Sequence, residues 1–356
     1  MDLNATSIPS LPRKLLVAGG MGGTNVGESL QRAATRLGIH TVQLNTRDAY
    51  AGSRLWQLIN WHLRGKRPVN QHGFEQKLLQ ACREERPDVL LTTGLAPLSA
   101  SVLKQIGALG VRRINFLTDD PWNPAHRAEW FLAALPQYDL VCTPRRAMED
   151  DLQALGCRQI RYVPFGYDEE LFFAPSPADI AAATTVPAAD VSFAGGADPD
   201  RVPYMQALLD AGFTLALYGD YWRRHAATRH IARGIADVAT VRVVVAKAKV
   251  SLCLVRRANR DGNCMRTFEV PAIGGCMLLE DTAEHREIFG AEGINVLYFA
   301  DQASMIEQTR RLCNDAALRQ RLAANAHQLM MTGGHTYRDR LISMLLPDAS
   351  CRMSTP

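Results

Sequence analysis

Short apolar runs alternate with longer amphipathic runs along almost the whole chain, and this alternation restricts the folds open to it. The apolar runs have the length of strands and the amphipathic runs that of helices. Strands that alternate with helices form a parallel sheet with helices on both faces. The first set of expected strands comprises residues 15–18, 40–44, 89–92, 113–117, 140–142 and 160–163, with helices expected at 26–37, 74–84, 98–108 and 145–155.

Residues 174–189 interrupt this alternation. They are rich in Ala, Pro and Thr and lack a periodic apolar face, which indicates a connection between domains. A second alternation follows, in which residues 239–249 are ambiguous because they mix helix formers with β-branched residues. The second set of expected strands comprises residues 191–194, 214–218, 250–255, 276–279 and 294–299, followed by helices at 304–314, 316–331 and 337–346.

The sequence therefore predicts an α/β chain with two Rossmann-like, doubly wound parallel-sheet domains that face each other across a cleft. A length of 356 residues agrees with this, because it exceeds what one hydrophobic core usually serves. The expected divisions are a first domain at 1–175, a linker at 176–189, a second domain at 190–334 and a terminal helix at 335–348. Open parallel sheets bind ligands at the carboxyl ends of their strands, so residues directly after the expected strands are the candidates for a site.

Charge and hydropathy exclude several classes of protein. The net charge is +4, with 40 basic against 36 acidic residues, which is too balanced to indicate a nucleic-acid partner. No segment approaches the roughly 20 apolar residues of a membrane helix, so no membrane span is expected. The first residues, Met1 to Asn4, lack the basic and apolar regions of a secretory signal. The 8 cysteines form no CxxC pair and several lie in apolar runs, as expected for reduced thiols of a cytoplasmic protein.

A glycine cluster directly after the first expected strand is the first candidate. Gly20, Gly22 and Gly23 would let backbone amides approach a ligand at the start of a helix. Their spacing departs from GxGxxG, and a tight turn between strand and helix explains them equally well. In either case we expect them at the edge of the cleft.

Two adjacent aspartates, Asp119 and Asp120, follow another expected strand. Together with Trp122 and His126 in the loop behind them, they could hold sugar hydroxyls. One carboxylate could also act as general base on an acceptor hydroxyl. Helix capping is the alternative, but a cap needs only one carboxylate, so we favour a functional role.

The second domain opens with a glycine turn of its own. Gly195 and Gly196 follow its first expected strand, and Arg201 comes shortly after. This combination suits a diphosphate, with a turn beside a solvated arginine as the alternative. Gly219 and Trp222 follow the next strand, where the indole could stack on a nucleobase or belong to the core.

The most informative stretch is residues 266–275, RTFEVPAIGG. Glu269 lies among apolar neighbours on a short expected helix, and a buried carboxylate is costly without partners. Ribose hydroxyls would be suitable partners, and Arg266 could reach a phosphate from three residues earlier. The alternative is an Arg–Glu pair on the helix surface.

Eight short stretches, in this order, resemble the CgeB-like (spore-maturation-protein-like) glycosyltransferases, which have the GT-B fold. The resemblance covers about residues 14–346, and its later motifs are the more specific ones. The stretches are TDDP at 118–121, CTP at 142–144, VPFGYDEELF at 163–172, SFAGG at 192–196, YGDYW at 218–222, RTFEVPAIGG at 266–275, LLEDT at 278–282 and HTYRDR at 335–340.

The resemblance implies that the second domain binds a nucleoside-diphosphate sugar, the first domain binds the acceptor, and the terminal helix returns to the first domain. Glu269 looks like the second acid of the E-x7-E motif of related retaining transferases, which holds the donor ribose. The first acid then falls on Asp261, a shorter side chain than the usual glutamate, and Thr282 joins the donor site through LLEDT. The candidates for neutralising the diphosphate are Arg201, Arg260 and Arg266.

We therefore expect a glycosyltransferase that retains the anomeric configuration and needs neither metal nor cofactor. Arginines and helix-terminal amides can stabilise a departing diphosphate without a metal. The Asp-Pro-Asp stretch at 198–200 has the spacing of a metal motif but reads as a turn and helix start. The acceptor could be a saccharide, a protein or a small molecule. Two alternatives stay open, a nucleotide-sugar 2-epimerase and a GT-B-like nucleotide-binding scaffold without catalysis.

Overall fold

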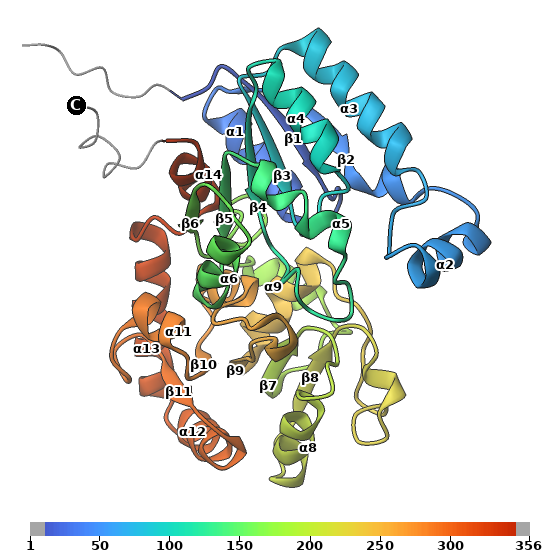
Figure 1. The fold of residues 1–356 in the computed structure, drawn as a ribbon. Coiled ribbons are helices and arrows are strands. Elements are labelled where there is room, and N and C mark those ends of the chain that lie inside the picture. The colour runs from blue at the N-terminus through green and yellow to red at the C-terminus, as the bar shows by residue number, and fades with distance from the viewer. Residues whose placement is uncertain (1–10, 347–356) are drawn as a thin grey trace, which may run out of the picture. The chain divides into compact units, whose positions relative to one another are not determined.

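The computed structural model describes residues 11–346, which form two compact units (Figure 1). The first unit comprises the chain up to Pro164 together with the segment from Tyr337 on, and the second comprises residues 165–336. The division therefore lies before residues 176–189, where we predicted the linker. That segment carries helix α7 (Pro177–Ala182), which begins with a capping box and packs against α9 (Val238–Lys247) of the second unit.

The first unit contains a six-stranded parallel sheet in the order β2-β1-β3-β4-β5-β6. Because β1 lies between β2 and β3, the chain reverses its progress across the sheet beside β1, and open sheets bind ligands at such switch points. The strands are β1 (Lys14–Gly19), β2 (His40–Asn45), β3 (Val89–Thr93), β4 (Arg112–Phe116), β5 (Leu140–Thr143) and β6 (Ile160–Tyr162). The helices are α1 (Val26–Arg36), α2 (Arg54–Leu63), α3 (Gln71–Glu85), α4 (Ala100–Ala108), α5 (Glu129–Leu132), α6 (Glu149–Ala154) and α14 (Tyr337–Leu345).

The second unit repeats this plan with a five-stranded parallel sheet in the order β11-β10-β9-β7-β8. Here the switch point lies between β7 and β9, so their carboxyl ends adjoin. The strands are β7 (Ala189–Ala194), β8 (Leu215–Tyr218), β9 (Ala248–Cys253), β10 (Met277–Glu280) and β11 (Leu297–Phe299). Besides α7 and α9, the helices are α8 (Val202–Asp210), α10 (Met265–Ile273), α11 (Ala283–Phe289), α12 (Gln302–Asn314) and α13 (Ala316–Thr332).

Both sheets are built from nearly continuous apolar runs because helices cover both of their faces. Residues 15–18 of β1 are fully buried, and every residue of β10 is buried. The ambiguous residues 239–249 span a junction, since α9 ends where β9 begins. Their mixed composition therefore belongs to two successive elements.

Helix α14 belongs to the first unit although it ends the described chain. It packs against α1, and Nη1 of Arg112 on β4 donates a hydrogen bond to the Leu345 carbonyl at 2.7 Å. Of the terminal helix expected at 335–348, residues 347 and 348 lie outside the described part, as do Met1 to Asn4. Within residues 11–346, no helix combines the length and apolar character needed to cross a bilayer.

Candidate functional site

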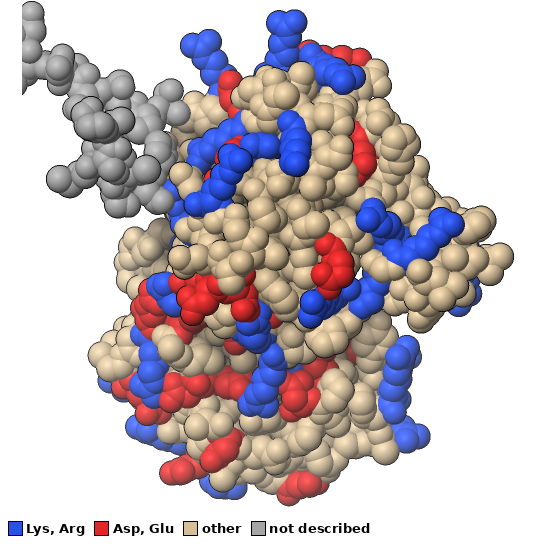
Figure 2. All heavy atoms as spheres, viewed as in Figure 1, with Lys and Arg blue, Asp and Glu red and all other residues tan. Residues whose placement is uncertain are grey.

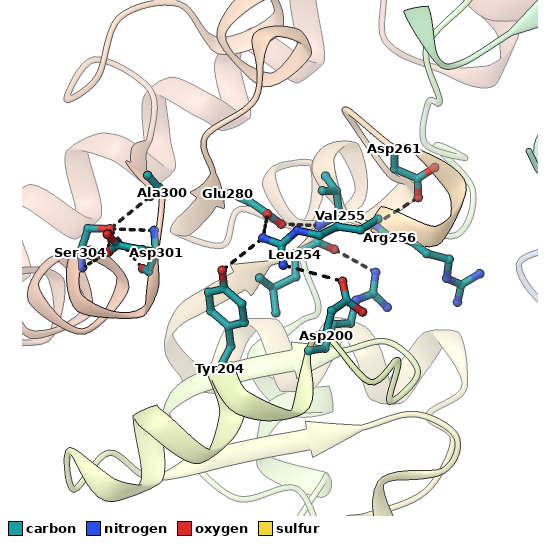
Figure 3. Close-up of polar contacts among 12 residues, drawn as sticks. Asp200, Tyr204, Leu254, Val255, Arg256, Asp261, Glu280, Ala300, Asp301 and Ser304 are labelled. Carbon is teal, nitrogen blue, oxygen red and sulfur yellow. Dashed lines mark hydrogen bonds and ion pairs between the residues drawn. The ribbon is translucent and has the colours of Figure 1, made fainter. Parts of the chain in front are cut away.

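The loops after β7, β8, β9 and β10 lie at the same edge of the second unit's parallel sheet. Figure 3 shows residues that follow β7 and β9 together with Glu280 at the end of β10. The structure brings most of the predicted donor residues of the second domain to this edge, because they lie in the loops or in the first turns of the helices that follow parallel strands. Their side chains differ sharply in burial and pairing. These differences decide which of them can contact a ligand.

The glycine turns after β7 and β8 are in direct backbone contact. Gly219 has a φ of +136°, and a Cβ built on it would lie 2.0 Å from the Gly195 carbonyl oxygen. The two loops can therefore approach this closely only with glycine at 219. At Gly196, by contrast, a built Cβ would meet nothing within 4 Å. The backbone at Gly196 thus has open space on that side, as an approaching phosphate would need.

Arg201 holds the loops together instead of offering its charge to a ligand. Its buried guanidinium donates to the carbonyls of Gly196 at 3.3 Å and Leu254 at 3.1 Å. It also forms an ion pair with Asp198 at 3.1 Å. Since these contacts join the ends of β7 and β9, we revise its predicted role from diphosphate ligand to structural cation.

Trp222 is also a core residue. Its ring is fully buried, lies edge-to-face with Phe193 at 5.8 Å between centroids, and donates from Nε1 to the Gly195 carbonyl at 2.8 Å. A nucleobase cannot stack on a buried ring, so this prediction is corrected. The exposed aromatic ring of the loop is Tyr221, which is 55% exposed, has a φ of +70° and lies 4.2 Å from the guanidinium carbon of Arg224.

Two arginines after β9, Arg256 and Arg257, were not among the predicted site residues; Figure 3 labels the first of them. Arg256 pairs with Asp198 at 2.9 Å, while Arg257 pairs with the buried Glu280 at 2.6 Å and donates to the Tyr204 hydroxyl at 3.2 Å. Glu280 also accepts from the Val255 amide at 3.1 Å. Both arginine side chains remain nearly half exposed, so they add positive charge to the surface of the site.

Asp261 and Thr282 fix the shape of the loop that follows these arginines. Asp261 accepts a hydrogen bond from the Arg256 amide at 3.3 Å. Thr282 donates to the Gly262 carbonyl at 2.6 Å and caps α11 by accepting from the His285 amide at 3.0 Å. A Cβ at Gly262 would lie 2.3 Å from the Glu284 carboxyl carbon, so the loop packs tightly onto α11. Both predicted residues therefore shape the loop.

Glu269 is the buried carboxylate that the sequence predicts. Its side chain is fully buried on α10 and ion-paired with Arg266, and its Oε1 has no hydrogen-bond partner within residues 11–346. Arg266 also donates from Nε to the Ala194 carbonyl at 3.1 Å, which joins α10 to the end of β7. The pair is therefore buried at the switch point and does not lie on a helix surface. An unsatisfied buried carboxylate oxygen is costly, and a ligand hydroxyl would satisfy it.

His285 connects two elements that carry residues of the candidate site. Its Nδ1 lies 2.7 Å from the Glu280 carbonyl oxygen and its Nε2 lies 3.0 Å from the Thr267 hydroxyl oxygen. Because a carbonyl only accepts, Nδ1 carries the proton and Nε2 accepts from Thr267. Burial lowers the pKa of His285 to about 4, so the ring is neutral at physiological pH. The imidazole thus joins the end of β10 to the first turn of α10.

We expect the free energy of unfolding to fall as the pH drops from 6.5 to about 4. In this window the unfolded chain binds a proton at residue 285 and the folded chain does not, so acid favours unfolding. Above pH 6.5 neither state is protonated and this contribution is constant. The expected total loss is about 3 kcal/mol. Urea unfolding at a series of pH values measures it.

The control for this prediction is a second histidine. His285→Gln should flatten the slope in this window, whereas His230→Gln, at an exposed position, should leave it unchanged. An equal slope in the parent and in His285→Gln would show that the neutral, buried imidazole does not govern acid stability.

In the first unit, the glycine loop after β1 is held by the start of α1. Gly22 has a φ of +84° and Gly23 a φ of +63°, and the Gly22 amide donates to Glu28 at 2.6 Å. A Cβ at Gly20 would lie 2.8 Å from the side-chain oxygen of Asn25. The loop is thus a tight turn between strand and helix, the alternative that we left open, and it does lie at the switch point of its sheet.

The two aspartates after β4 have different roles. Asp120 is buried. Its carboxylate accepts a hydrogen bond from the Trp122 amide at 2.9 Å, and its backbone carbonyl accepts one from Nε2 of His126 at 2.7 Å. It therefore builds the turn that carries Trp122 and His126, and its proposed catalytic role is withdrawn. Asp119 is half-buried and lies beside Gly94 at the end of β3, where a built Cβ would be 3.4 Å from its carboxylate.

The carboxylates with metal-motif spacing are paired with arginines. Asp198 contacts Arg201 and Arg256, and Asp200 lies 3.9 Å from Arg257. Across the described part of the chain, no group of three or more His, Cys, Asp or Glu side chains is placed to share a metal ion. The described cysteines are free thiols, and Cys351 lies outside the described residues.

Comparison with known proteins agrees with this architecture. Residues 201–345 match a family described as glycosyl transferase-like. No curated protein sequence matches the chain significantly.

Three solved structures resemble nearly the whole chain. Sucrose-phosphate synthase from Thermosynechococcus elongatus has 14% identity and a TM-score of 0.66, over 93% of this chain and 97% of that one. Anabaena HepE in complex with UDP-glucose has 14% identity and a TM-score of 0.66, over 93% of this chain and 99% of that one. A UDP-forming α,α-trehalose-phosphate synthase from Burkholderia xenovorans has 14% identity and a TM-score of 0.61, over 94% of this chain and 98% of that one.

The two Rossmann-like units of this chain thus form the GT-B fold of these glycosyltransferases, and residues 201–345 match the glycosyl transferase-like family.

Proposed function

We propose that this protein is a glycosyltransferase that takes a sugar from a UDP-sugar donor bound in the second unit and transfers it to an acceptor bound in the first. The observation that carries this proposal is Glu269, a fully buried carboxylate with an unsatisfied Oε1 at the switch point of a GT-B fold. The solved relatives support the choice of uridine, since HepE was crystallised with UDP-glucose and the trehalose-phosphate synthase is UDP-forming.

Glu269 would accept hydrogen bonds from the donor ribose. In the structure, its carboxylate pairs with Arg266, whose side chain is 26% exposed. We propose that Arg266 turns towards the diphosphate when the donor binds, and that ribose hydroxyls take its place at the carboxylate. After this exchange the arginine is paired with the diphosphate, and the buried carboxylate accepts hydrogen bonds from the hydroxyls.

The diphosphate would lie against the Gly196 turn. Backbone amides at a glycine turn before a helix bind anions, and the arginines after β9 add charge beside it. Arg257 joins Arg260 and Arg266 as a candidate in place of Arg201, because the guanidinium of Arg201 is buried in structural contacts. Tyr221 replaces Trp222 as the candidate platform for the base.

The proposed reaction retains the anomeric configuration and needs no metal. Cleavage of the sugar–phosphate bond leaves negative charge on the diphosphate, which fixed arginines and amides would stabilise. Asp261 takes the place of the first acid of E-x7-E in the CgeB-like pattern, and Asp119 is the candidate for holding or deprotonating an acceptor hydroxyl. The candidate acceptors are saccharides, proteins and small molecules.

Release of UDP tests this function. We expect the protein, incubated with UDP-glucose, UDP-galactose or UDP-N-acetylglucosamine without acceptor, to release UDP slowly by hydrolysis of at least one of them. The rate should be the same with EDTA and with magnesium. A changed sugar without free UDP would favour a 2-epimerase, and nucleotide binding without either change would favour a scaffold.

A further inference from the structure

Helix α2 of the first unit turns its apolar face towards solvent. Leu55, Leu58, Ile59 and Leu63 have the spacing of one helical face, and Leu55, Leu58 and Leu63 are 66%, 51% and 79% exposed. Surface helices normally bury such a stripe against the core. Only Asn60 of this helix is buried, so the apolar side chains contribute little to the core of the unit.

Two tryptophans and several cations accompany these leucines. Trp56 and Trp61 are nearly half exposed. The guanidinium carbon of Arg64 lies 5.6 Å from the centroid of the Trp56 ring, and the Lys66 ammonium lies 5.5 Å from that of Trp61. Indole rings with neighbouring cations are typical of the boundary between headgroups and acyl chains.

The charged side chains of the segment that carries the helix have a single sign. Residues 49–70 include Arg54, Arg64, Lys66 and Arg67 and contain no aspartate or glutamate. Figure 2 shows this part of the first unit, where α2 is drawn in Figure 1, as a surface of uncharged residues flanked by basic side chains. An apolar face surrounded by cations complements a surface that has an apolar interior and an anionic outer layer.

We propose that α2 docks the protein onto anionic phospholipid bilayers, with its leucines and tryptophans in the headgroup region and its cations on lipid phosphates. The helix is ten residues long, too short to span a bilayer, and would lie in the plane of the interface. It is already formed, since Ser53 caps it by accepting from the Trp56 amide at 3.4 Å. Binding would therefore cost little ordering of the backbone. This inference is independent of the proposed activity.

Vesicle sedimentation of the full chain tests the proposal. We expect at least roughly tenfold stronger partition onto vesicles of about 3:1 phosphatidylcholine and phosphatidylglycerol than onto phosphatidylcholine alone, with weaker binding at high salt. Tryptophan emission should shift to the blue on binding. The variant Leu55→Ser/Leu58→Ser/Leu63→Ser should lose this partition by a similar factor, and Arg64→Ser/Arg67→Ser should lose the preference for the anionic lipid.

The matched control is Leu109→Ser/Ile235→Ser/Ile294→Ser, which removes three exposed apolar side chains elsewhere. It should bind like the parent. Absence of binding to anionic vesicles, or equal binding by both triple variants, would overturn the proposal. So would a dimer in light scattering that dissociates in the α2 variant while vesicles bind neither protein, since α2 would then be a self-association face. If the α2 variant fails to fold, the lipid preference of the arginine variant and the salt dependence of the parent still test whether α2 binds anionic bilayers.

Discussion

Glu269→Gln is expected to weaken binding of UDP by about 100-fold, or roughly 3 kcal/mol, while the chain stays folded. The carboxylate can accept hydrogen bonds from two ribose hydroxyls on its two oxygens, whereas the amide offers one oxygen. Titration calorimetry of the parent and the variant measures the change in affinity, and circular dichroism confirms the fold.

The matched control is another buried carboxylate. Glu75 in the first unit accepts hydrogen bonds from the Ser99 amide at 2.7 Å and from Gln71 at 3.2 Å. Glu75→Gln should reduce stability and leave the affinity for UDP unchanged. If both variants lose affinity in proportion to their loss of stability, Glu269 has only a structural role and the ribose site must lie elsewhere.

Gly219→Ala is expected to destabilise the second unit by about 3 kcal/mol or more. The added methyl group would meet the Gly195 carbonyl at 2.0 Å, and the φ of +136° is one that L residues rarely adopt. The two glycine loops would have to separate, which would also disturb the proposed diphosphate site. Urea unfolding followed by circular dichroism measures the loss.

Gly196→Ala supplies the comparison. A methyl group there meets nothing within 4 Å, so the unfolding midpoint should stay close to that of the parent. Its effect should instead be on affinity, because the methyl group would extend into the space proposed for the diphosphate. Equal stability of Gly219→Ala and the parent would show that the two loops do not need their close approach.

The strands and their order along the chain could be predicted because a buried parallel strand leaves an apolar run bounded by turns. The boundary between the two units could not. Residues 174–189 look like a linker by composition, yet a capping box at Ser176 and Asp179 starts a helix there that packs on α9. Packing of this kind depends on partners more than 50 residues away, which local composition does not reveal.

The position of the candidate residues at one edge of the second sheet could be predicted from the sequence, and so could the burial of Glu269. Glu269 was identified from a single carboxylate among apolar neighbours, a pattern that requires a buried partner. Arg201 and Trp222 were assigned to the ligand because their types suit a phosphate and a base, but both side chains point into the unit. Sequence does not show the direction of a side chain in a loop. Arg256 and Arg257 were missed for the same reason, although two adjacent arginines directly after an apolar strand were a usable signal.

Binding of UDP to the parent protein tests directly whether the second unit carries a donor site. Thermal unfolding and calorimetry are followed with UDP and, for comparison, with GDP, dTDP, CDP and ADP, because a ligand that binds only the folded state raises the melting temperature. We expect one saturable site that prefers UDP and that Glu269→Gln weakens. No heat and no thermal shift with any of the five diphosphates would contradict a donor site at the carboxyl edge of the second sheet.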